Sequence, residues 1–280
     1  MITDAECIQF LQWSLPKLHL RWPGFRKVRR QIQKRLNRRL DELALPDVEA
    51  YRVYLNGHPA EWQTLDTLCW IGISRFYRDR VVFQHVEHEV LPQLAQLAAV
   101  RGDDEIRCWS AGCAGGEEPY TLAIIWRHRL ATRFPALRFR IVATDIDPVA
   151  IRRAARGCYR ASSLKDLPAE WRGQAFVTVA DELCLKDDYR AAATFLVQDI
   201  RERAPEGVFQ LILCRNLVFT YFDESLQKQT AQRLTDRLTP GGALIIGNRE
   251  SLPDGPWKIQ PWSVQLGVYR KALEPLTTCS

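Results

Sequence analysis

The sequence lacks the segments that membrane, secreted and metal-binding proteins usually carry. No apolar run approaches the roughly twenty residues of a membrane-spanning helix. The N-terminus has acids and polar residues where a secretory signal would be basic and then apolar. The eight cysteines include no Cys-x-x-Cys pair, and no His/Cys cluster has the spacing of a zinc site. We therefore expect a cytoplasmic protein with no membrane span and no metal site.

Length and composition are those of a soluble globular enzyme. The 280 residues can bury one large core and a smaller satellite domain. A hydrophobic content of 46% with 26% charged residues is an ordinary balance for such a protein. Cys108 and Cys214 lie inside predicted strands, so we expect reduced thiols in the core.

The hydrophobic pattern divides the chain into two parts. Residues 1–92 have a helical pattern and predict an N-terminal helical subdomain. In residues 93–280 strands and helices alternate, which is typical of a parallel sheet covered on both faces. The pattern is less regular over residues 157–193 and indicates a small insertion there. The predicted strands cover 106–110, 139–144, 194–198, 209–214, 243–247 and 264–270, and the predicted helices cover 117–131, 148–156 and 224–238.

A glycine-rich loop between a strand and a helix is the most informative feature of the sequence. The run Ile106–Trp109 predicts a strand, residues 110–116 read Ser-Ala-Gly-Cys-Ala-Gly-Gly, and a helix begins near Glu117. Such a layout lets the backbone approach a nucleotide-like ligand closely. The next predicted strand ends on Asp145, where a carboxylate suits the two hydroxyls of a ribose. The two signals together predict a cofactor that contains adenosine.

The charges beside the loop narrow the choice of cofactor. A dinucleotide site would leave the helix N-terminus open to a pyrophosphate. Glu117 and Glu118 stand at that place and would repel it, so NAD and FAD fit poorly. S-adenosylmethionine fits better because it carries an ammonium and a sulfonium beside its ribose. The alternative interpretation is that the two acids only stabilise the first helical turn through the helix dipole.

A basic segment lies near the N-terminus. Between Arg21 and Leu40 there are nine basic residues and no acids. Apolar residues recur there every three or four positions and predict an amphipathic helix over 21–40 with one apolar stripe. Its cationic surface is either a solvated face or a docking site for an acidic protein partner or nucleic acid. No basic ribbon with interleaved aromatic residues is present, which makes nucleic acid the weaker option.

Five motifs stand in order along the sequence. They are Arg75-Phe76-Tyr77-Arg78-Asp79, Ser110-Ala111-Gly112-Cys113 with Gly116-Glu117-Glu118-Pro119-Tyr120, Ala143-Thr144-Asp145-Ile146-Asp147, Gly157-Cys158-Tyr159-Arg160, and Cys214-Arg215-Asn216-Leu217 with Tyr221-Phe222-Asp223. Together they resemble the motifs of the CheR-type methyltransferases, which methylate glutamates of chemotaxis receptors. The resemblance covers roughly residues 65–270. It implies a class I methyltransferase fold, Rossmann-like with a mostly parallel seven-stranded sheet, an N-terminal helical subdomain and a small β insertion.

The resemblance also implies the site residues. Arg78 would reach into the catalytic cleft, and Tyr221 would stand near the methyl group. The residues that would contact S-adenosylmethionine are Ser74, Arg78, Gly112, Glu117 at the methionyl end, Asp145 at the ribose, Asp199 and Ile200 beside the adenine, and Asn216 and Leu217.

The sequence departs from the family pattern at several positions. Gly72 and Ser74 stand where the family usually has Asn and Thr. One extra residue separates Asn216 from Tyr221. The usual Gly-His-Ser-Glu near the end is Gly-Asn-Arg-Glu over residues 247–250.

The expected reaction is methyl transfer to a carboxylate, the protein glutamate of a chemoreceptor-like partner. A glutamate has an unperturbed pKa of about 4.3 and is already ionised at neutral pH, so no general base is required. Arg78 could bind such a carboxylate, and the structural alternative is a salt bridge from Arg78 to Asp79 or to a neighbouring acid. The other functions to consider are methylation of a small-molecule or other non-receptor acceptor, methylation of nucleic acid, and a non-catalytic adaptor. Methyltransferases that act on base amino groups carry an Asn-Pro-Pro-Tyr-like or Asp-Pro-Pro-Tyr-like tetrad after the fourth strand. This sequence has Arg215-Asn216-Leu217 there, which speaks against the nucleic-acid option.

Overall fold

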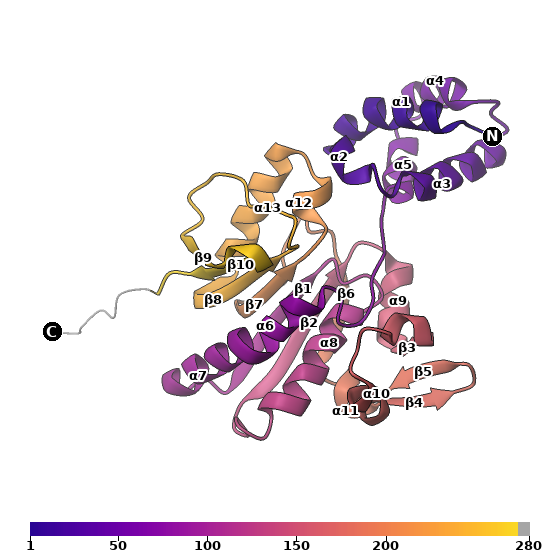
Figure 1. The fold of residues 1–280 in the computed structure, drawn as a ribbon. Helices are drawn as coiled ribbons and strands as arrows, with labels where there is room; N and C mark the ends of the chain where they lie inside the picture. Colours follow the sequence, from indigo (N-terminus) through magenta and orange to yellow (C-terminus); the bar gives the residue numbers. More distant parts are fainter. Residues whose placement is uncertain (274–280) are drawn as a thin grey trace. The chain divides into compact units, whose positions relative to one another are not determined.

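The computed structural model describes residues 1–273 of the chain (Figure 1). Contacts divide it into two compact units. The first unit contains residues 1–71 together with 220–227, and the second contains residues 72–219 together with the chain from 228 onward.

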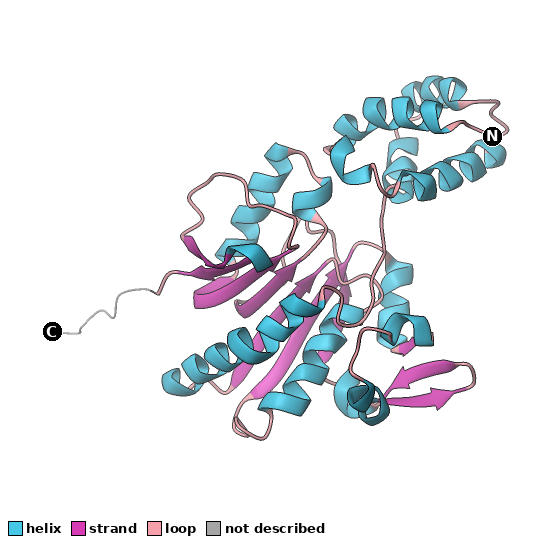
Figure 2. Ribbon diagram, in the orientation of Figure 1, coloured by secondary structure: helices cyan, strands magenta, loops and turns pink. Residues whose placement is uncertain are grey.

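The first unit is helical, as the sequence predicts (Figure 2). A capping box starts its first helix, because the Thr3 side chain accepts a hydrogen bond from the Glu6 N–H while Glu6 bonds back to Thr3. Apolar stripes such as Ile32 and Leu36 are fully buried between the helices. The helices are α1 (Asp4–Ser14), α2 (Trp22–Phe25), α3 (Arg29–Glu42), α4 (Val48–Gly57) and α5 (Glu61–Leu68).

The predicted single basic helix over 21–40 is wrong in its first third. Residues 22–25 form the single turn α2, and the long helix α3 begins only at Arg29. Pro23 is tolerated in the first turn of a helix but not further inside one. Gly24 lies so close to the Thr220 carbonyl oxygen that an added Cβ would be 2.3 Å from it. The chain therefore turns before the amphipathic pattern begins.

A buried ion pair joins α3 to α4 and α5 in this unit. Arg39 donates two hydrogen bonds to the carboxylate of Glu61, at 2.9 and 2.7 Å, and Tyr51 donates a third at 2.6 Å. Glu61 is only 6% exposed. Hydrogen bonding from Arg39 lowers the pKa of Glu61, so its carboxylate stays charged in the folded unit.

The second unit is built on a mixed sheet. Within residues 1–273 it has seven strands in the order β6-β2-β1-β7-β8-β10-β9. β6, β2, β1, β7 and β8 pair in parallel, and β10 pairs antiparallel with both β8 and β9. The predicted class I methyltransferase sheet is confirmed. The strands are β1 (Glu105–Ala111), β2 (Arg138–Asp145), β6 (Ala193–Val197), β7 (Phe209–Cys214), β8 (Leu238–Ile246), β9 (Ile259–Ser263) and β10 (Val268–Lys271).

The predicted strand over 264–270 is correct for residues 268–270, which belong to β10, and wrong for residues 264–267. Residues 264–266 form a 3-10 turn, and Gly267 follows with a φ of +67°. The positive φ at glycine reverses the chain, so β9 ends before this turn and β10 begins after it.

Helices cover the sheet of the second unit (Figure 2). Val82 and Leu94, on the segment before β1, pack with Ile106 and Leu211 of the sheet in one buried core. The division by contacts at residue 71 therefore lies well before the expected boundary at residue 92. The helices are α6 (Arg80–His85), a π-helical turn (Val86–Val90), α7 (Leu91–Arg101), α8 (Glu117–Ile125) with a π-helical turn (Trp126–Leu130), α9 (Pro148–Arg156), α10 (Ala169–Ala175), α11 (Asp187–Arg190), α12 (Val218–Tyr221) and α13 (Glu224–Asp236).

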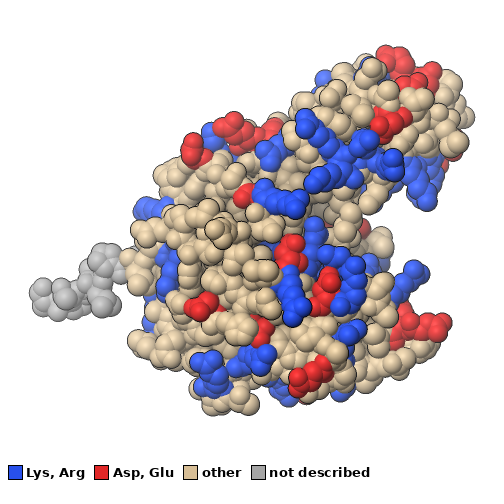
Figure 3. All heavy atoms as spheres, in the orientation of Figure 1, with Lys and Arg blue, Asp and Glu red and all other residues tan. Residues whose placement is uncertain are grey.

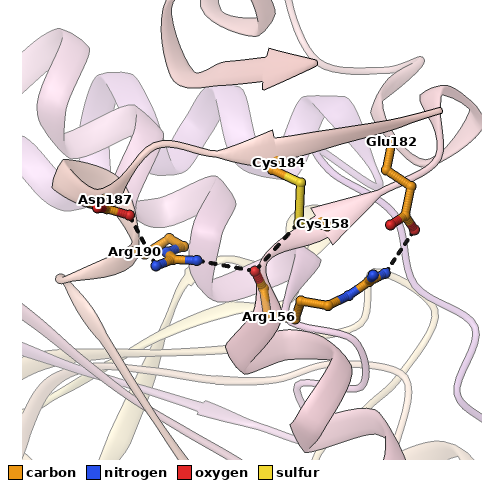
Figure 4. The surroundings of a disulfide bond; sticks show 6 residues. All are labelled: Arg156, Cys158, Glu182, Cys184, Asp187 and Arg190. Atoms are coloured by element: carbon orange, nitrogen blue, oxygen red, sulfur yellow. Dashed lines mark hydrogen bonds and ion pairs between the residues drawn. A yellow bond between two sulfur atoms is a disulfide. The ribbon is translucent and has the colours of Figure 1, made fainter. Parts of the chain in front are cut away.

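A second, small sheet lies where the sequence indicates an insertion. Its described strands are β3 (Cys158–Tyr159), β4 (Phe176–Val179) and β5 (Glu182–Leu185), in the order β3-β5-β4. A disulfide joins Cys158 to Cys184 across β3 and β5 (Figure 4). The sequence reasoning missed this pair because its two cysteines are 26 positions apart and belong to no spacing motif.

The other cysteines of the described chain are reduced. Cys108 and Cys214 are buried free thiols, as the sequence predicts, and so are the three remaining cysteines in residues 1–273. Across the same residues, no helix combines the length and apolarity needed to cross a membrane.

We predict that Glu61→Gln lowers the free energy of unfolding by about 2 kcal/mol at pH 7, since it weakens charge-assisted hydrogen bonds to a buried group. The lowered pKa of Glu61 gives stability that is present above the unfolded pKa and is lost as the pH falls. The difference from wild type should therefore shrink below about pH 4.5. Urea denaturation of the variant and of wild type at several pH values measures this difference in the free energy of unfolding.

The matched control is Glu42→Gln, which removes the exposed second partner of Arg39. Exposed pairs contribute only about 0–1 kcal/mol. Equal losses for the two variants would contradict a special role for the buried pair.

Candidate active site

The glycine-rich loop is fixed to the end of the neighbouring strand. The N–H groups of Gly112 and Cys113 donate to the Thr144 carbonyl at 2.8 and 2.9 Å. The Ala114 N–H donates to the carboxylate of Asp145 at 2.8 Å. Parallel pairing in register brings Ala111 of β1 beside Thr144 of β2, so both strands end at the same edge of the sheet. The predicted cofactor loop and the predicted ribose acid therefore meet.

Two glycines of this loop have no room for a side chain. Gly112 has a φ of +75°, and an added Cβ would be 2.5 Å from Leu217. Gly116 has a φ of +88°, and an added Cβ would be 2.8 Å from Ala154. Only glycine tolerates such a backbone at such contacts. The structure thus brings together Gly112 and Leu217, two of the predicted cofactor contacts.

Glu117 is the first residue of α8 and is 1% exposed. Its Oε1 accepts a hydrogen bond from Arg153 at 2.6 Å, while its Oε2 is buried and has no hydrogen-bond partner. Burial raises the pKa of Glu117, and the Arg153 charge and the Ser74 hydroxyl counteract this rise. A buried carboxylate oxygen with an open acceptor position is suited to the ammonium group of a methionyl ligand.

Asp145 retains acceptor capacity beside the loop. One oxygen accepts the Ala114 N–H and the other accepts the Asp147 N–H at 3.0 Å. A carboxylate has about four acceptor positions, so two hydroxyl groups can still be bound. Burial raises the pKa of Asp145 as well. Three features of this edge thus fit S-adenosylmethionine. They are the buried oxygen of Glu117 without a hydrogen-bond partner, the loop at Gly112, and the carboxylate of Asp145 with positions for a ribose.

The predicted adenine contacts lie at the end of the next strand. Arg201 holds the carboxylate of Asp199, with its Nε 2.9 Å from Oδ2 and its backbone N–H 2.8 Å from Oδ1. Ile200 is 6% exposed, and its carbonyl accepts a hydrogen bond from Arg233 at 2.7 Å. Both oxygens of Asp199 accept hydrogen bonds from Arg201, which also neutralises the charge of the carboxylate. An adenine ring at this place would therefore meet a neutralised carboxylate and the apolar side chain of Ile200.

Asn216 follows β7 with a φ of +55°. Its N–H donates to the Glu250 carboxylate at 2.9 Å, and the Gly247 N–H donates to the same oxygen at 2.6 Å. Positive φ is uncommon outside glycine, and asparagine tolerates it better than most residues. Glu250 therefore fixes the backbone that carries Asn216 and Leu217.

The segment around Arg78 has an unusual backbone. Tyr77 and Asp79 both have positive φ values, of 57° and 63°. Asp79 pairs with Arg215 at 2.6 Å, and Arg215 also donates to the Arg78 carbonyl at 3.2 Å. The guanidinium of Arg78 donates to the Ile73 carbonyl at 2.7 Å. The alternative salt bridge between Arg78 and Asp79 is therefore wrong, and no ion pair of Arg78 occurs within residues 1–273.

Arg215 also connects this segment to α8. Its side chain is 3% exposed and donates to Glu118 at 3.1 Å. Glu118 accepts a second hydrogen bond from the Ser110 hydroxyl at 2.8 Å. The two adjacent acids at the start of α8 thus differ: each oxygen of Glu118 accepts a hydrogen bond, whereas Oε2 of Glu117 accepts none.

Tyr221 belongs to the first unit by its contacts. Its ring packs on Phe25 with centroids 4.8 Å apart, and its carbonyl accepts the Arg21 N–H at 2.8 Å. Its placement near the methyl group stays a prediction.

Sequence reasoning missed three residues that support the site. Arg153, Arg215 and Glu250 hold Glu117, Asp79 and the backbone of Asn216 respectively. Arg215 and Glu250 stand inside quoted motifs, which is the signal that could have found them. Arg153 had no signal, because its contact with Glu117 depends on how α9 packs against α8.

The fold and this site together define an S-adenosylmethionine-dependent methyltransferase. A family model described as "CheR methyltransferase, SAM binding domain" matches residues 73–267. The chain belongs to the CheR methyltransferase family. Within residues 1–273, no group of His, Cys, Asp and Glu could hold a metal ion.

Curated relatives agree with this assignment. A "Chemotaxis protein methyltransferase" of Listeria innocua is 36% identical over 186 residues, which cover 66% of this chain and 68% of the relative. One of Escherichia coli is 33% identical over 235 residues, covering 80% of this chain and 77% of the relative. "Chemotaxis protein methyltransferase 2" of Vibrio cholerae is 28% identical over 261 residues, covering 90% of this chain and 87% of the relative.

We predict that affinity for S-adenosylhomocysteine falls as the pH is lowered through the raised pKa of Glu117, because the protonated acid loses its attraction for an ammonium. Arg153→Gln removes the positive charge that lowers this pKa, so the fall in affinity should begin at a higher pH. Titration calorimetry at a series of pH values measures the shift.

Arg152→Gln is the matched control, because Arg152 is an exposed neighbour on α9. An unchanged pH profile in Arg153→Gln would contradict the assignment of Glu117 as the titrating group.

We further predict that Arg215→Lys lowers turnover about tenfold to a hundredfold while affinity for S-adenosylhomocysteine changes less than about threefold. A lysine ammonium cannot replace the planar fork that reaches Asp79, the Arg78 carbonyl and Glu118 together. Arg80→Lys, at an exposed position beside Asp79, is the control. Equal losses of affinity and turnover would show that Arg215 supports the fold alone.

Proposed function

We propose that this protein transfers a methyl group from S-adenosylmethionine to a glutamate carboxylate of a chemoreceptor-like protein. The observation that carries the proposal is the guanidinium of Arg78, which lies in a family motif and has no ion pair within the described chain. A cation of this kind suits an acidic acceptor. The printed names of the relatives, "Chemotaxis protein methyltransferase", support the choice of partner.

The chain's residues have distinct roles in this proposal. Glu117 binds the ammonium of the cofactor, and Ser74 lies beside it. Asp145 binds the ribose hydroxyls, and the loop at Gly112 gives close backbone approach. The rest of the cofactor site is lined by Asp199 and Ile200 beside the adenine and by Asn216 and Leu217.

The reaction depends on the positions of the acceptor carboxylate and the methyl group more than on acid–base catalysis. The bound cofactor supplies an electrophilic methyl group on a sulfonium. A glutamate acceptor is ionised near pH 7, so no residue has to remove a proton. Holding the reacting atoms in line can lower the barrier by roughly 7–11 kcal/mol. Arg78 orients the acceptor carboxylate, and Tyr221 stands near the methyl group.

The basic surface of the first unit supports an acidic protein partner. Arg26, Lys27, Arg30 and Lys34 are exposed, and none has an ion pair within residues 1–273. Figure 3 shows lysine and arginine side chains gathered on the drawn face of this unit. A glutamate-rich receptor segment would be attracted to them. With a receptor of this kind as acceptor, the site of action is the cytoplasm.

We predict that labelled cofactor and a chemoreceptor cytoplasmic fragment give a product from which base releases the label, because carboxyl methyl esters are hydrolysed by alkali. Arg78→Ala should abolish labelling and retain affinity for S-adenosylhomocysteine. Alkali-stable label would indicate an amine or ether product and contradict the proposal. Label confined to small molecules or nucleic acid would assign another acceptor.

We also predict that Arg30→Glu with Lys34→Glu raises the KM for the receptor fragment about tenfold or more and leaves the KM for the cofactor unchanged. Reversing two charges weakens long-range attraction to an acidic segment, and the effect should diminish at high salt. Arg138→Glu, on an exposed residue of the second unit, is the control. An unchanged KM would exclude this surface from acceptor binding.

A further inference from the structure

The disulfide of the small sheet lies directly across two paired strands. Cys158 of β3 is the pairing partner of Cys184 of β5, and their Cα atoms are 4.0 Å apart. Both residues are half-buried, so small thiols in solution can reach the pair. Figure 4 shows the bond beside the ion pair of Arg156 with Glu182, at 2.7 Å.

The strand that carries Cys158 also carries a support of the cofactor loop. Tyr159, the next residue, is 1% exposed, and its hydroxyl donates to the Gly115 carbonyl at 2.8 Å. The same hydroxyl would be 3.0 Å from a Cβ added to Gly116. Tyr159 therefore contacts Gly115 and Gly116, the last two residues before Glu117, and supports the backbone of the loop there.

The disulfide is the covalent link between β3 and β5, and the backbone ladder beside it is short. β3 has only two residues, and Leu185 N–H donates to the Gly157 carbonyl at 2.8 Å beside it. The ion pair of Arg156 with Glu182 is largely exposed and contributes at most about 1 kcal/mol. Tyr159 itself is anchored in the main core, but a short edge strand exchanges its backbone hydrogen bonds more easily than a long central one. Removing the covalent link therefore loosens the backbone that carries Tyr159.

The other thiols of the described residues are protected from the same chemistry. All five other cysteines within residues 1–273 are buried. Burial raises the pKa of Cys7 to about 11 and that of Cys69 to about 12. Because the thiolate is the reactive form, these groups exchange slowly with disulfides. Among the cysteines of residues 1–273, oxidation is thereby directed to Cys158 and Cys184.

We propose that Cys158 and Cys184 form a redox-active site that exchanges with small thiol–disulfide couples, and that the disulfide state binds the cofactor more tightly than the dithiol state. In the oxidising direction a thiolate of the pair attacks an external disulfide such as oxidised glutathione and releases one glutathione. The second cysteine then displaces the other glutathione. The two protein thiols lose two electrons and two protons, and one external disulfide becomes two thiols.

The test compares the full-length protein in its two redox states. One sample is equilibrated with oxidised glutathione and the other with dithiothreitol, and alkylation with mass spectrometry counts the thiols in each. Titration calorimetry then gives the Kd for S-adenosylhomocysteine. We expect the dithiol form to bind about fivefold to tenfold more weakly. The variant Cys158→Ser with Cys184→Ser should bind like the dithiol form in both conditions.

Two further variants test the route of the coupling. Tyr159→Phe keeps the ring and removes the hydrogen bond to Gly115, so its affinity should be lower and should no longer depend on redox state. Cys69→Ser, in the first unit, should keep the full redox dependence of wild type.

Three results would overturn the proposal. These are equal Kd values in the two states, a redox dependence that persists without Cys158 and Cys184, and a full dependence in Tyr159→Phe. The proposal rests on cofactor binding and not on the receptor substrate. Absence of binding in both states would instead contradict the cofactor site itself, so the two failures are distinguishable.

Discussion

The attachment of the glycine-rich loop to the end of β2 is the constraint on which the site depends. Three consecutive N–H groups of the loop, from Gly112 to Ala114, donate to the Thr144 carbonyl and the Asp145 carboxylate. This fixes where α8 begins, and with it the position of Glu117. The same carboxylate keeps positions for a ribose. The carboxylate that we propose as the ribose acid therefore also shapes the loop.

Two arginines behind this edge give the adjacent acids Glu117 and Glu118 different hydrogen-bonding states. Arg153 binds one oxygen of Glu117 and leaves the other without a hydrogen bond, whereas Arg215 and Ser110 each donate to one oxygen of Glu118. Arg215 is buried and also holds the strained segment next to Arg78. Because a buried cation needs several hydrogen bonds, this one side chain links the start of α8 to the segment that carries Arg78.

Much of this arrangement follows from local sequence. The strands at 106–110, 139–144 and 209–214 agree with the structure because their apolar runs are bounded by glycine or acids. Asp145 and Glu117 could be placed because parallel strands end at one edge of the sheet.

Other features depend on contacts that no local pattern shows. The basic helix starts late because Gly24 approaches the Thr220 carbonyl, about two hundred positions away. The contact of Arg153 with Glu117 and the disulfide at Cys158 each arise from packing between elements.

Glu117 offers the most direct test of the central claim, that its buried open oxygen binds the ammonium of the cofactor. Calorimetry should compare Glu117→Gln with wild type for S-adenosylhomocysteine and for methylthioadenosine, which lacks the amino-acid part. A lost charge-assisted hydrogen bond predicts about tenfold weaker binding of the first ligand, or more, and unchanged binding of the second. Equal losses for both ligands, or no loss for either, would contradict the account.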